Sequence, residues 1–292
     1  MANIAIITRT KDRPVFLRRA LKSVSSQSYT DYEHVIINDN GDQAAVEKAV
    51  TAVDESRRAK ITVIHRDTPS AGPDTIFTES VDLTKSNYVV IHDDDDSWHP
   101  DFLARTTTYL DEHPNLGGVV TRTDKVIERV EGDGVKTIKT FQLMPEVKVI
   151  NLYRQCVDNQ LTPIAFVYRR QAYEAVGKYD SSLPVCGDWE FGIRLLQQYD
   201  VDFLDPGYAL AYYHHRQLPK HGRGDNSFAA FDHRYYVNLI MNRYLRQELK
   251  EGKLGVGYIM NQARYNQSSL AQMIKRLLPR RVSNLLKNRV SS

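Results

Sequence analysis

Four aspartates stand in a row at residues 93–96, directly after the apolar run "YVVIH" at 88–92. Adjacent carboxylates repel one another, so such a run needs either a positive partner or contact with water. Side chains at i and i+2 of an extended segment point the same way, which lets Asp93 and Asp95 address one ligand. Carboxylate oxygens suit hard divalent cations such as Mg²⁺ and Mn²⁺. The run is therefore either a metal site or a solvated acidic turn.

The elements around the run predict a mostly parallel α/β sheet. Strand-length runs rich in β-branched residues occur at 4–7, 34–38, 61–65 and 88–92. They lack polar alternation, as is typical of strands that are buried on both faces of a sheet. Helices are predicted from Pro14 onward, over 42–53 and over 100–113. This order of strands and helices is that of an α/β fold.

Polar residues follow three of these strands. The first strand runs into "TRTKDR", the second into "NDNGD" and the last into "DDDD". In open α/β sheets, ligands bind beyond the carboxyl ends of the strands. We therefore expect a binding site at this edge of the sheet.

The second half of the chain is expected to complete the same domain and to form a second substrate pocket. Strands are predicted for "TIKTF", "IAFVYR", "VDFLD" and "YALAYYHH", with a helix around "DWEFGIRLLQQY". A long helix is predicted over 228–249 and ends before Gly252.

Composition narrows the class of protein. With 41% hydrophobic and 26% charged residues, the chain of 292 residues has the composition of a globular domain. No run approaches the roughly 20 apolar residues of a membrane span. The start lacks a signal-peptide pattern and there are only two cysteines, so we expect a cytoplasmic location. Residues 270–292 hold six of the 39 Lys and Arg residues and no acid, which leaves 33 basic against 36 acidic residues elsewhere. Nucleic-acid binding is therefore not expected.

Four segments resemble family 2 glycosyltransferases of the GT-A fold, of the type that builds bacterial surface polysaccharides. "YVVIHDDDDSWHPDFL" is similar to their D-x-D segment, and "VIINDNGD" is similar to their second-strand signature. "IITRTKDRPVFLRRALKSVSSQSY" resembles their nucleotide-binding strand and helix, and "VGKYDSSLPVCGDWEFGIRLL" resembles the region of their catalytic base. The resemblance runs from about residue 3 to about residue 230.

The resemblance implies the fold and its division. We expect a Rossmann-like GT-A domain over 1–230, with a mixed, mostly parallel sheet flanked by helices. Residues 1–115 would form the nucleotide-sugar half and 116–230 the acceptor half. A helical C-terminal extension would follow over 231–292.

The resemblance also implies roles for individual residues. Asp188 matches the base that takes the proton of the acceptor hydroxyl. Asp95 is expected to bind a Mn²⁺ or Mg²⁺ ion directly, with Asp93 or Asp94 assisting. The residues expected to bind the nucleotide sugar are Thr8, Arg9, Thr10, Arg13, Asp39, Asp93 and Asp94.

Two histidines are further candidate metal ligands. The segment "AYYHHRQLPKHGRGDNSF" contains His215 and His221, and members of the family often add a late histidine to the metal. A polar surface loop is the alternative interpretation. An Ala-Arg-Asn stretch that relatives often carry is absent, so Arg13, Arg216 or Arg223 is expected to neutralise the donor phosphates.

The C-terminal residues 269–290 form a predicted basic amphipathic helix. Apolar residues recur at i, i+3, i+4 and i+7, and basic residues fill the other positions. This pattern suits an anionic membrane surface, and Pro279 should kink the helix. Packing on its own domain or on a second subunit of a homo-oligomer is the alternative.

The expected function is an inverting, metal-dependent transfer of one sugar per encounter. The donor would be a nucleotide sugar, most simply a UDP- or dTDP-sugar, and the acceptor a glycan or lipid-linked glycan of O-antigen, capsule or similar assembly. One alternative is a catalytically silent nucleotide-binding or scaffold subunit, which would have no use for Asp188. Another is a nucleotidyltransferase, but "TRTKDRP" lacks the glycines of its phosphate loop.

Overall fold

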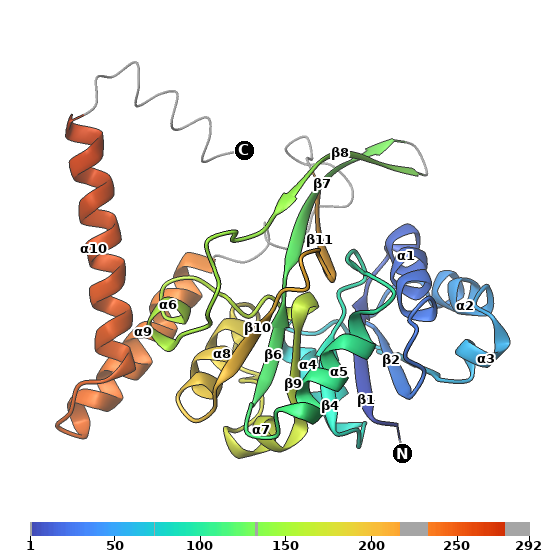
Figure 1. Ribbon diagram of the computed structural model, residues 1–292, viewed down its shortest axis with the longest axis horizontal. Helices are drawn as coiled ribbons and strands as arrows, with labels where there is room; N and C mark the ends of the chain where they lie inside the picture. The colour runs from blue at the N-terminus through green and yellow to red at the C-terminus, as the bar shows by residue number, and fades with distance from the viewer. Residues whose placement is uncertain (1, 73, 132–133, 217–232, 278–292) are drawn as a thin grey trace.

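The protein is described by a computed structural model, which covers residues 2–72, 74–131, 134–216 and 233–277 (Figure 1). Side chains are described up to residue 266. Two sheets and their flanking helices form the body, and two C-terminal helices extend from one side of it (Figure 1). No helix within the described ranges is long and apolar enough to span a bilayer.

Four parallel strands form the N-terminal part of the larger sheet. They are β1 (Ile4–Thr10), β2 (Tyr32–Asn38), β3 (Ile61–His65) and β4 (Tyr88–Ile91). All four were predicted from their apolar runs. Strand β1 lies between β2 and β4, so its buried isoleucines pack in the middle of the sheet.

The second half of the chain adds three strands to this sheet, and the sequence predicted those at 166–169 and 201–204 but not the one at 118–121. The sheet adds β6 (Gly118–Thr121), β9 (Phe166–Arg169) and β10 (Val201–Leu204), in the order β10-β6-β9-β4-β1-β2-β3. Strand β9 is antiparallel to β4 and to β6, and the other neighbours are parallel. The sheet is therefore mixed and mostly parallel, which confirms the predicted fold class.

A smaller sheet stands against the end of the larger one. It consists of β5 (Ser97–Trp98), β11 (Ala211–Arg216), β7 (Thr123–Glu131) and β8 (Gly134–Gln142). Strands β7 and β8 form a long hairpin that extends beyond the body of the molecule (Figure 1). The sequence predicted β8 and β11, but not the short β5 or the half-polar β7.

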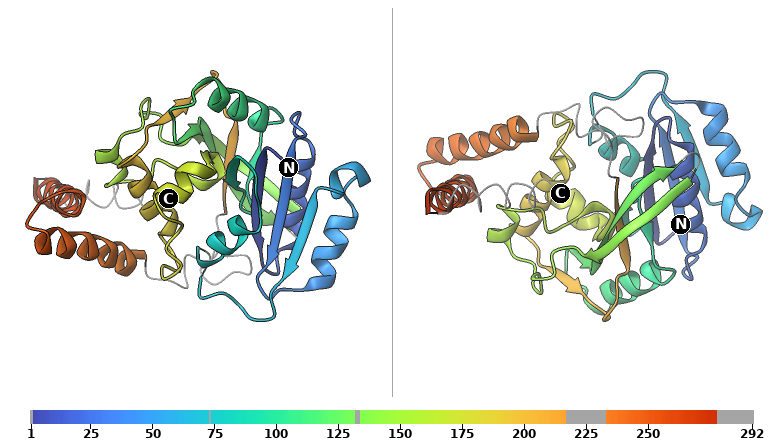
Figure 2. Two further views of the ribbon diagram at one scale, coloured as in Figure 1. Left: turned by 90° about the horizontal axis from the view of Figure 1, so that it is seen from below. Right: turned by 90° about the horizontal axis from the view of Figure 1, so that it is seen from above.

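Helices flank the larger sheet. Helices α1 (Pro14–Ser25) and α2 (Gln43–Thr51) pack on β2 through a cluster that includes Leu17, Ile36 and Val46 (Figure 2). The remaining helices are α3 (Glu55–Arg58), α4 (Thr75–Asp82), α5 (Phe102–Glu112), α6 (Leu152–Gln155), η1 (Pro163–Ala165), α7 (Arg170–Ala175), α8 (Gly187–Leu196), α9 (His233–Lys250) and α10 (Val256–Leu277). Helix α4 was not predicted. Helix α9 is described from His233, and its predicted start at residue 228 lies outside the described residues.

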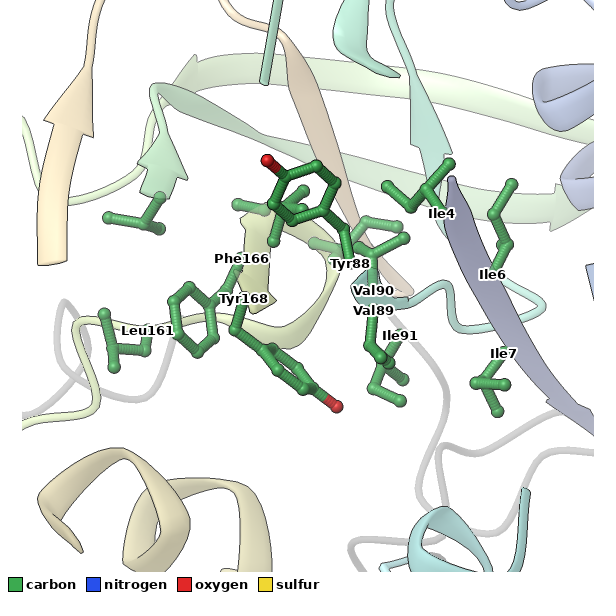
Figure 3. Packing of buried hydrophobic residues seen from close by; sticks show 14 of the residues in the cluster. Ile4, Ile6, Ile7, Tyr88, Val89, Val90, Ile91, Leu161, Phe166 and Tyr168 are labelled. Atoms are coloured by element: carbon green, nitrogen blue, oxygen red, sulfur yellow. The ribbon is translucent and has the colours of Figure 1, made fainter. Parts of the chain in front are cut away.

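The main core lies between the larger sheet and side chains of α4, α5, α7 and α8. Figure 3 shows side chains from β1, β4 and β9 gathered in one cluster, among them Ile7, Ile91 and Tyr168. A separate cluster joins α8 to α9 and α10 through Trp189, Met241 and Met260. The C-terminal helices are thus anchored to the same element that carries Asp188.

Candidate active site

The register of β1 and β4 brings the basic and acidic strand ends together. Ile7 pairs with Ile91 in parallel register, so Arg9 comes level with Asp93 and Thr10 with Asp94. Accordingly, an Arg9 Nη2 atom lies 3.6 Å from Asp93 Oδ1. The Thr10 hydroxyl donates a hydrogen bond of 2.7 Å to Asp94 Oδ2. The predicted meeting of the strand ends is confirmed for these residues.

Arginines surround the acidic run. Arg13, just before α1, pairs with Asp94 through Nη2 and Nε, and its Nη1 lies 3.4 Å from Asp95 Oδ2. Arg216, at the end of β11, places Nη2 at 2.5 Å from the same Asp95 oxygen. Arg19 of α1 donates to the main-chain carbonyl of Asp95. The positive charges of these three guanidinium groups therefore offset the electrostatic repulsion among the four carboxylates.

The four carboxylates differ in their environments. Burial raises the pKa of Asp93, and it raises the pKa of Asp94 to about 6 in spite of Arg13. At Asp95, burial also acts to raise the pKa, but Arg13, Arg216 and Arg19 together hold it below its usual range. Asp95 is therefore the most firmly ionised member of the run.

Asp96 has a structural contact. Its Oδ1 accepts a 2.7 Å hydrogen bond from the main-chain N–H of His214, which ties the run to β11 of the smaller sheet. Burial, followed by the charges of Asp95 and Asp93, raises the pKa of Asp96 well above its usual value. This carboxyl is best described as a link between the two sheets.

A cavity of about 480 Å³ lies beyond these strand ends. The predicted residues that line it are Arg9, Arg13, Asp93, Asp95 and Asp188. Apolar side chains form much of the remaining wall: Phe77, Leu143, Met144, Val157, Pro163, Val185, Trp189 and Val237. Such a cavity, with a few converging charged groups on an apolar wall, is typical of a small-molecule site.

Asp188 stands in the first turn of α8. Its Oδ2 accepts a 2.8 Å hydrogen bond from Asn159 Nδ2. Burial raises its pKa, and Asp93 across the cavity adds to this, whereas the Trp189 N–H and Asn159 oppose it. A buried carboxylate with a raised pKa is the kind of group that acts as a general base near neutral pH.

The other predicted donor-binding residues lie outside this lining. Thr8 is fully buried and its hydroxyl lies 2.8 Å from His34 Nε2. Asp39 accepts hydrogen bonds from both the N–H and the hydroxyl of Ser70 and lies near Arg66. Asp94 is fully buried between Thr10 and Arg13. Their proposed roles toward a nucleotide stay predictions.

The structure places one of the two predicted histidine ligands. His215 lies on β11 and is not among the described residues that line the cavity. His221 and Arg223 lie outside the described residues. Within the described part of the chain, no cluster of three or more His, Cys, Asp or Glu side chains could hold a metal by itself.

Two further polar side chains near these elements have structural contacts. His92 is fully buried against Trp98 and the carbonyl of Asp93, which makes it a core histidine. Arg194 pairs with Glu190 of its own helix and donates to the carbonyls of Val176, Gly177 and Lys178. Arg194 therefore anchors α8 and does not reach the cavity.

Comparison with known proteins shows the family to which this chain belongs. The model of the family described as Glycosyl transferase family 2 matches residues 5–177, more than half of the chain. The chain belongs to this family. As a family 2 glycosyl transferase, it carries the D-x-D aspartates within the matched region and Asp188 just beyond it.

Individual relatives and structures agree with this assignment. The colanic acid biosynthesis glycosyl transferase WcaA of Escherichia coli is 24% identical over 199 residues, which cover 67% of either chain. The structure of S. aureus TarS 1-349 in complex with UDP-GlcNAc matches with a TM-score of 0.62 at 19% identity, over 83% of this chain and 66% of that one. The mannosyltransferase PcManGT of Pyrobaculum calidifontis, in complex with GDP-Man and Mn²⁺, matches with a TM-score of 0.58 at 14% identity, over 99% and 80%. At these identities the two structures show the shared GT-A fold.

This family 2 glycosyl transferase also has site residues that the sequence analysis missed. Asp74 and Asn159 line the cavity close to Asp188, and Arg19 supports the acidic run. Asp74 and Asn159 lie in segments without a periodic pattern, so only the folded chain reveals them.

Replacing Asp94 should destabilise the fold. The Asp94→Asn variant keeps the shape of the side chain but leaves the partly buried Arg13 with a weaker partner. Because the charge-assisted hydrogen bonds to Asp94 are weakened while Arg13 keeps Asp95 as a second partner, we expect the free energy of unfolding to fall by about 1.5 kcal/mol in urea denaturation.

The matched control is Asp101→Asn, which alters a half-exposed carboxylate of the same segment. That surface change should shift the free energy of unfolding by less than about 0.5 kcal/mol. Equal losses in the two variants would show that Arg13 and Asp94 do not stabilise the strand ends.

Proposed function

We propose that the protein is an inverting, metal-dependent glycosyltransferase that moves one sugar per encounter from a nucleotide-sugar donor to a hydroxyl group of a glycan. The observation that supports this most is the common cavity of Asp93, Asp95 and Asp188 with Arg9 and Arg13. The reaction needs positive charge beside the departing diphosphate and a base beside the attacking hydroxyl. Both kinds of group line the same space.

The proposed donor is a UDP- or dTDP-sugar. Arg9 and Arg13 line the cavity and offer guanidinium groups that suit phosphate oxygens. The complexes of TarS with UDP-GlcNAc and of PcManGT with GDP-Man support a nucleotide-sugar donor on this fold. Thr8, Thr10 and Asp39 remain the proposed nucleotide side of the site.

The residues fit a divalent metal ion. Asp93 and Asp95 supply hard oxygen ligands to one cavity, and the Asp93 side chain is 26% exposed, with its nearest guanidinium nitrogen 3.6 Å away. A Mn²⁺ or Mg²⁺ ion that also binds a diphosphate needs only one or two protein carboxylates. Such an ion would stabilise the charge of the leaving nucleoside diphosphate. Asp93 and Asp95 are the proposed ligands, and Asp94 is not, because both of its oxygens already have partners.

Asp188 is the proposed general base. Its carboxylate would take the proton of the acceptor hydroxyl as that oxygen attacks the anomeric carbon. The hydrogen bond from Asn159 fixes one oxygen of Asp188, and the raised pKa keeps the carboxylate basic. Attack from the side opposite the diphosphate gives inversion.

The proposed acceptor is a growing bacterial surface glycan, free or lipid-linked. Relatedness to the colanic acid glycosyl transferase WcaA supports this class. A lipid-linked acceptor would place the enzyme on the cytoplasmic face of the membrane, where the basic tail 269–290 is proposed to bind. The side chains of that tail lie outside the described ones.

Replacing the proposed base should stop transfer without loss of donor binding. For Asp188→Asn we expect a fall in kcat of roughly 10³-fold or more, because general-base catalysis and the charge of the base are both lost. The measurement is sugar transfer from radiolabelled donors, alongside calorimetric binding of the matching nucleoside diphosphate.

Asp180→Asn is the matched control, because Asp180 precedes α8 but pairs with Arg243 at the surface. It should retain transfer. If Asp188→Asn turned over like the control, Asp188 would not be the base. A wild-type protein that binds donor without any transfer would support the silent scaffold instead.

Truncation after residue 268 tests the proposed membrane contact. Helix α10 packs on α9 through residues before that point, Met260 and Ala263 among them, so the shortened chain should fold. We expect the full-length protein to sediment with anionic liposomes and the truncated one to stay in solution. High salt should weaken the full-length binding, since surface attraction to anionic lipid is screened. Equal sedimentation of both proteins would exclude the tail as the membrane contact.

A further inference from the structure

The start of α4 is packed tightly against the segment that leads into α8. A Cβ atom added at Gly72 would lie 2.3 Å from Pro184 Cβ, so the two segments approach as closely as glycine allows. The main-chain N–H of Asp74 donates to the carbonyl of Pro184 at 3.3 Å. These contacts fix the position of Asp74 relative to α8.

The side chain of Asp74 caps α8 from outside the helix. Its Oδ2 accepts a 2.8 Å hydrogen bond from the N–H of Gly187, the first residue of α8. The preceding Cys186 has a left-handed backbone, with φ of 66°, and provides no side-chain cap. A Cβ atom on Gly187 would lie 3.1 Å from Asp74 Cβ, so the carboxyl of Asp74 occupies the space beside that glycine.

Asp74 therefore contacts Gly187, the residue directly before Asp188. The carboxyl groups of Asp74 and Asp188 both line the cavity. Asp74 is only 9% exposed. The ionisable groups that face it are Arg9 from β1, Asp93 after β4, and Cys186 and Asp188 at the start of α8. Burial first, and then the charge of Asp188, raise the pKa of Asp74 to about 8, although Arg9 and the Gly187 N–H oppose this.

We propose that Asp74 is a positioning residue that holds the start of α8 and carries the single proton of a carboxyl pair formed with Asp188. This inference rests on the proposed function of Asp188 as the base. Ionising both of two buried carboxyls at one helix start costs much free energy, because burial and mutual repulsion disfavour the second charge. One of them therefore keeps its proton at neutral pH. A protonated Asp74 still accepts the hydrogen bond from Gly187 and leaves the negative charge on Asp188.

The pH dependence of stability tests the proton without any assay of transfer. The unfolded chain releases the proton of Asp74 near pH 4, whereas the folded chain would keep it to about pH 8. Between these values the folded state binds more protons than the unfolded state, so the stability of the wild type falls as pH rises. Asp74→Asn has no such proton. We therefore expect the Tm of the wild type minus that of Asp74→Asn to fall by several degrees from pH 5 to pH 8, measured in EDTA.

Kinetics test the positioning role. Asp74→Ala removes both the cap and the neutral carboxyl, and we expect its kcat to fall by about tenfold or more with donor affinity unchanged. Asp74→Asn can still accept the Gly187 hydrogen bond and is neutral, so it should recover most of the kcat that the Ala variant loses. Asp82→Asn is the matched control, because Asp82 ends the same helix and pairs with Lys178 at the surface.

Two results would overturn the proposal. A Tm difference that stays constant from pH 5 to pH 8 would show that Asp74 carries no proton there. An Asn variant as slow as the Ala variant would show that the ionised carboxylate is needed. Failure of the proposed function can be told apart from failure of this proposal. If the wild type showed no transfer, the Tm comparison would still report whether Asp74 carries the proton.

Discussion

The electrostatic repulsion among four consecutive carboxylates at the end of a buried strand requires positively charged and hydrogen-bonding partners in the elements around the run. The run is held because Arg13 and Arg19 reach it from α1 and its entry, and Arg216 reaches it from β11. Asp96 then ties the run to the main chain of the smaller sheet. The two sheets therefore meet where the charge is most concentrated, and the meeting point becomes one wall of the cavity. A partly exposed Asp93 is left facing that cavity.

The opposite wall depends on α8. This helix brings Asp188 to the cavity, and it is held by Asp74 at its start and by the contacts of Arg194 near its end. The α9–α10 pair packs on the same helix through Trp189. The basic and acidic side chains of the first wall thus come largely from the N-terminal strand ends, whereas Asp188, the proposed base, comes from the second half of the chain. A cavity between two such walls suits a reaction that joins two substrates.

The features that could be predicted from the sequence are those that depend on a local residue pattern or on the parallel register of neighbouring strands. β-branched runs marked the strands of the N-terminal half, and parallel register alone places Arg9 beside Asp93. It did not predict contacts between distant loops. The Asp74–Gly187 hydrogen bond joins residues 113 positions apart, and Arg216 reaches Asp95 across 121 positions. Such contacts depend on how irregular segments pack, for which single residues carry no periodic signal. For the same reason, the binding of Asp39 by Ser70 was not foreseen.

We propose that the aspartate run and its arginines form the site for a metal-bound nucleoside diphosphate. Isothermal calorimetry with UDP, dTDP, GDP and CDP, each in Mn²⁺ and in EDTA, tests it most directly. We expect one nucleotide to bind in Mn²⁺ and to bind far more weakly in EDTA. Equal affinity in EDTA would mean that the arginines alone hold the diphosphate. Binding of none of the four in either condition would contradict a donor site at the end of β4.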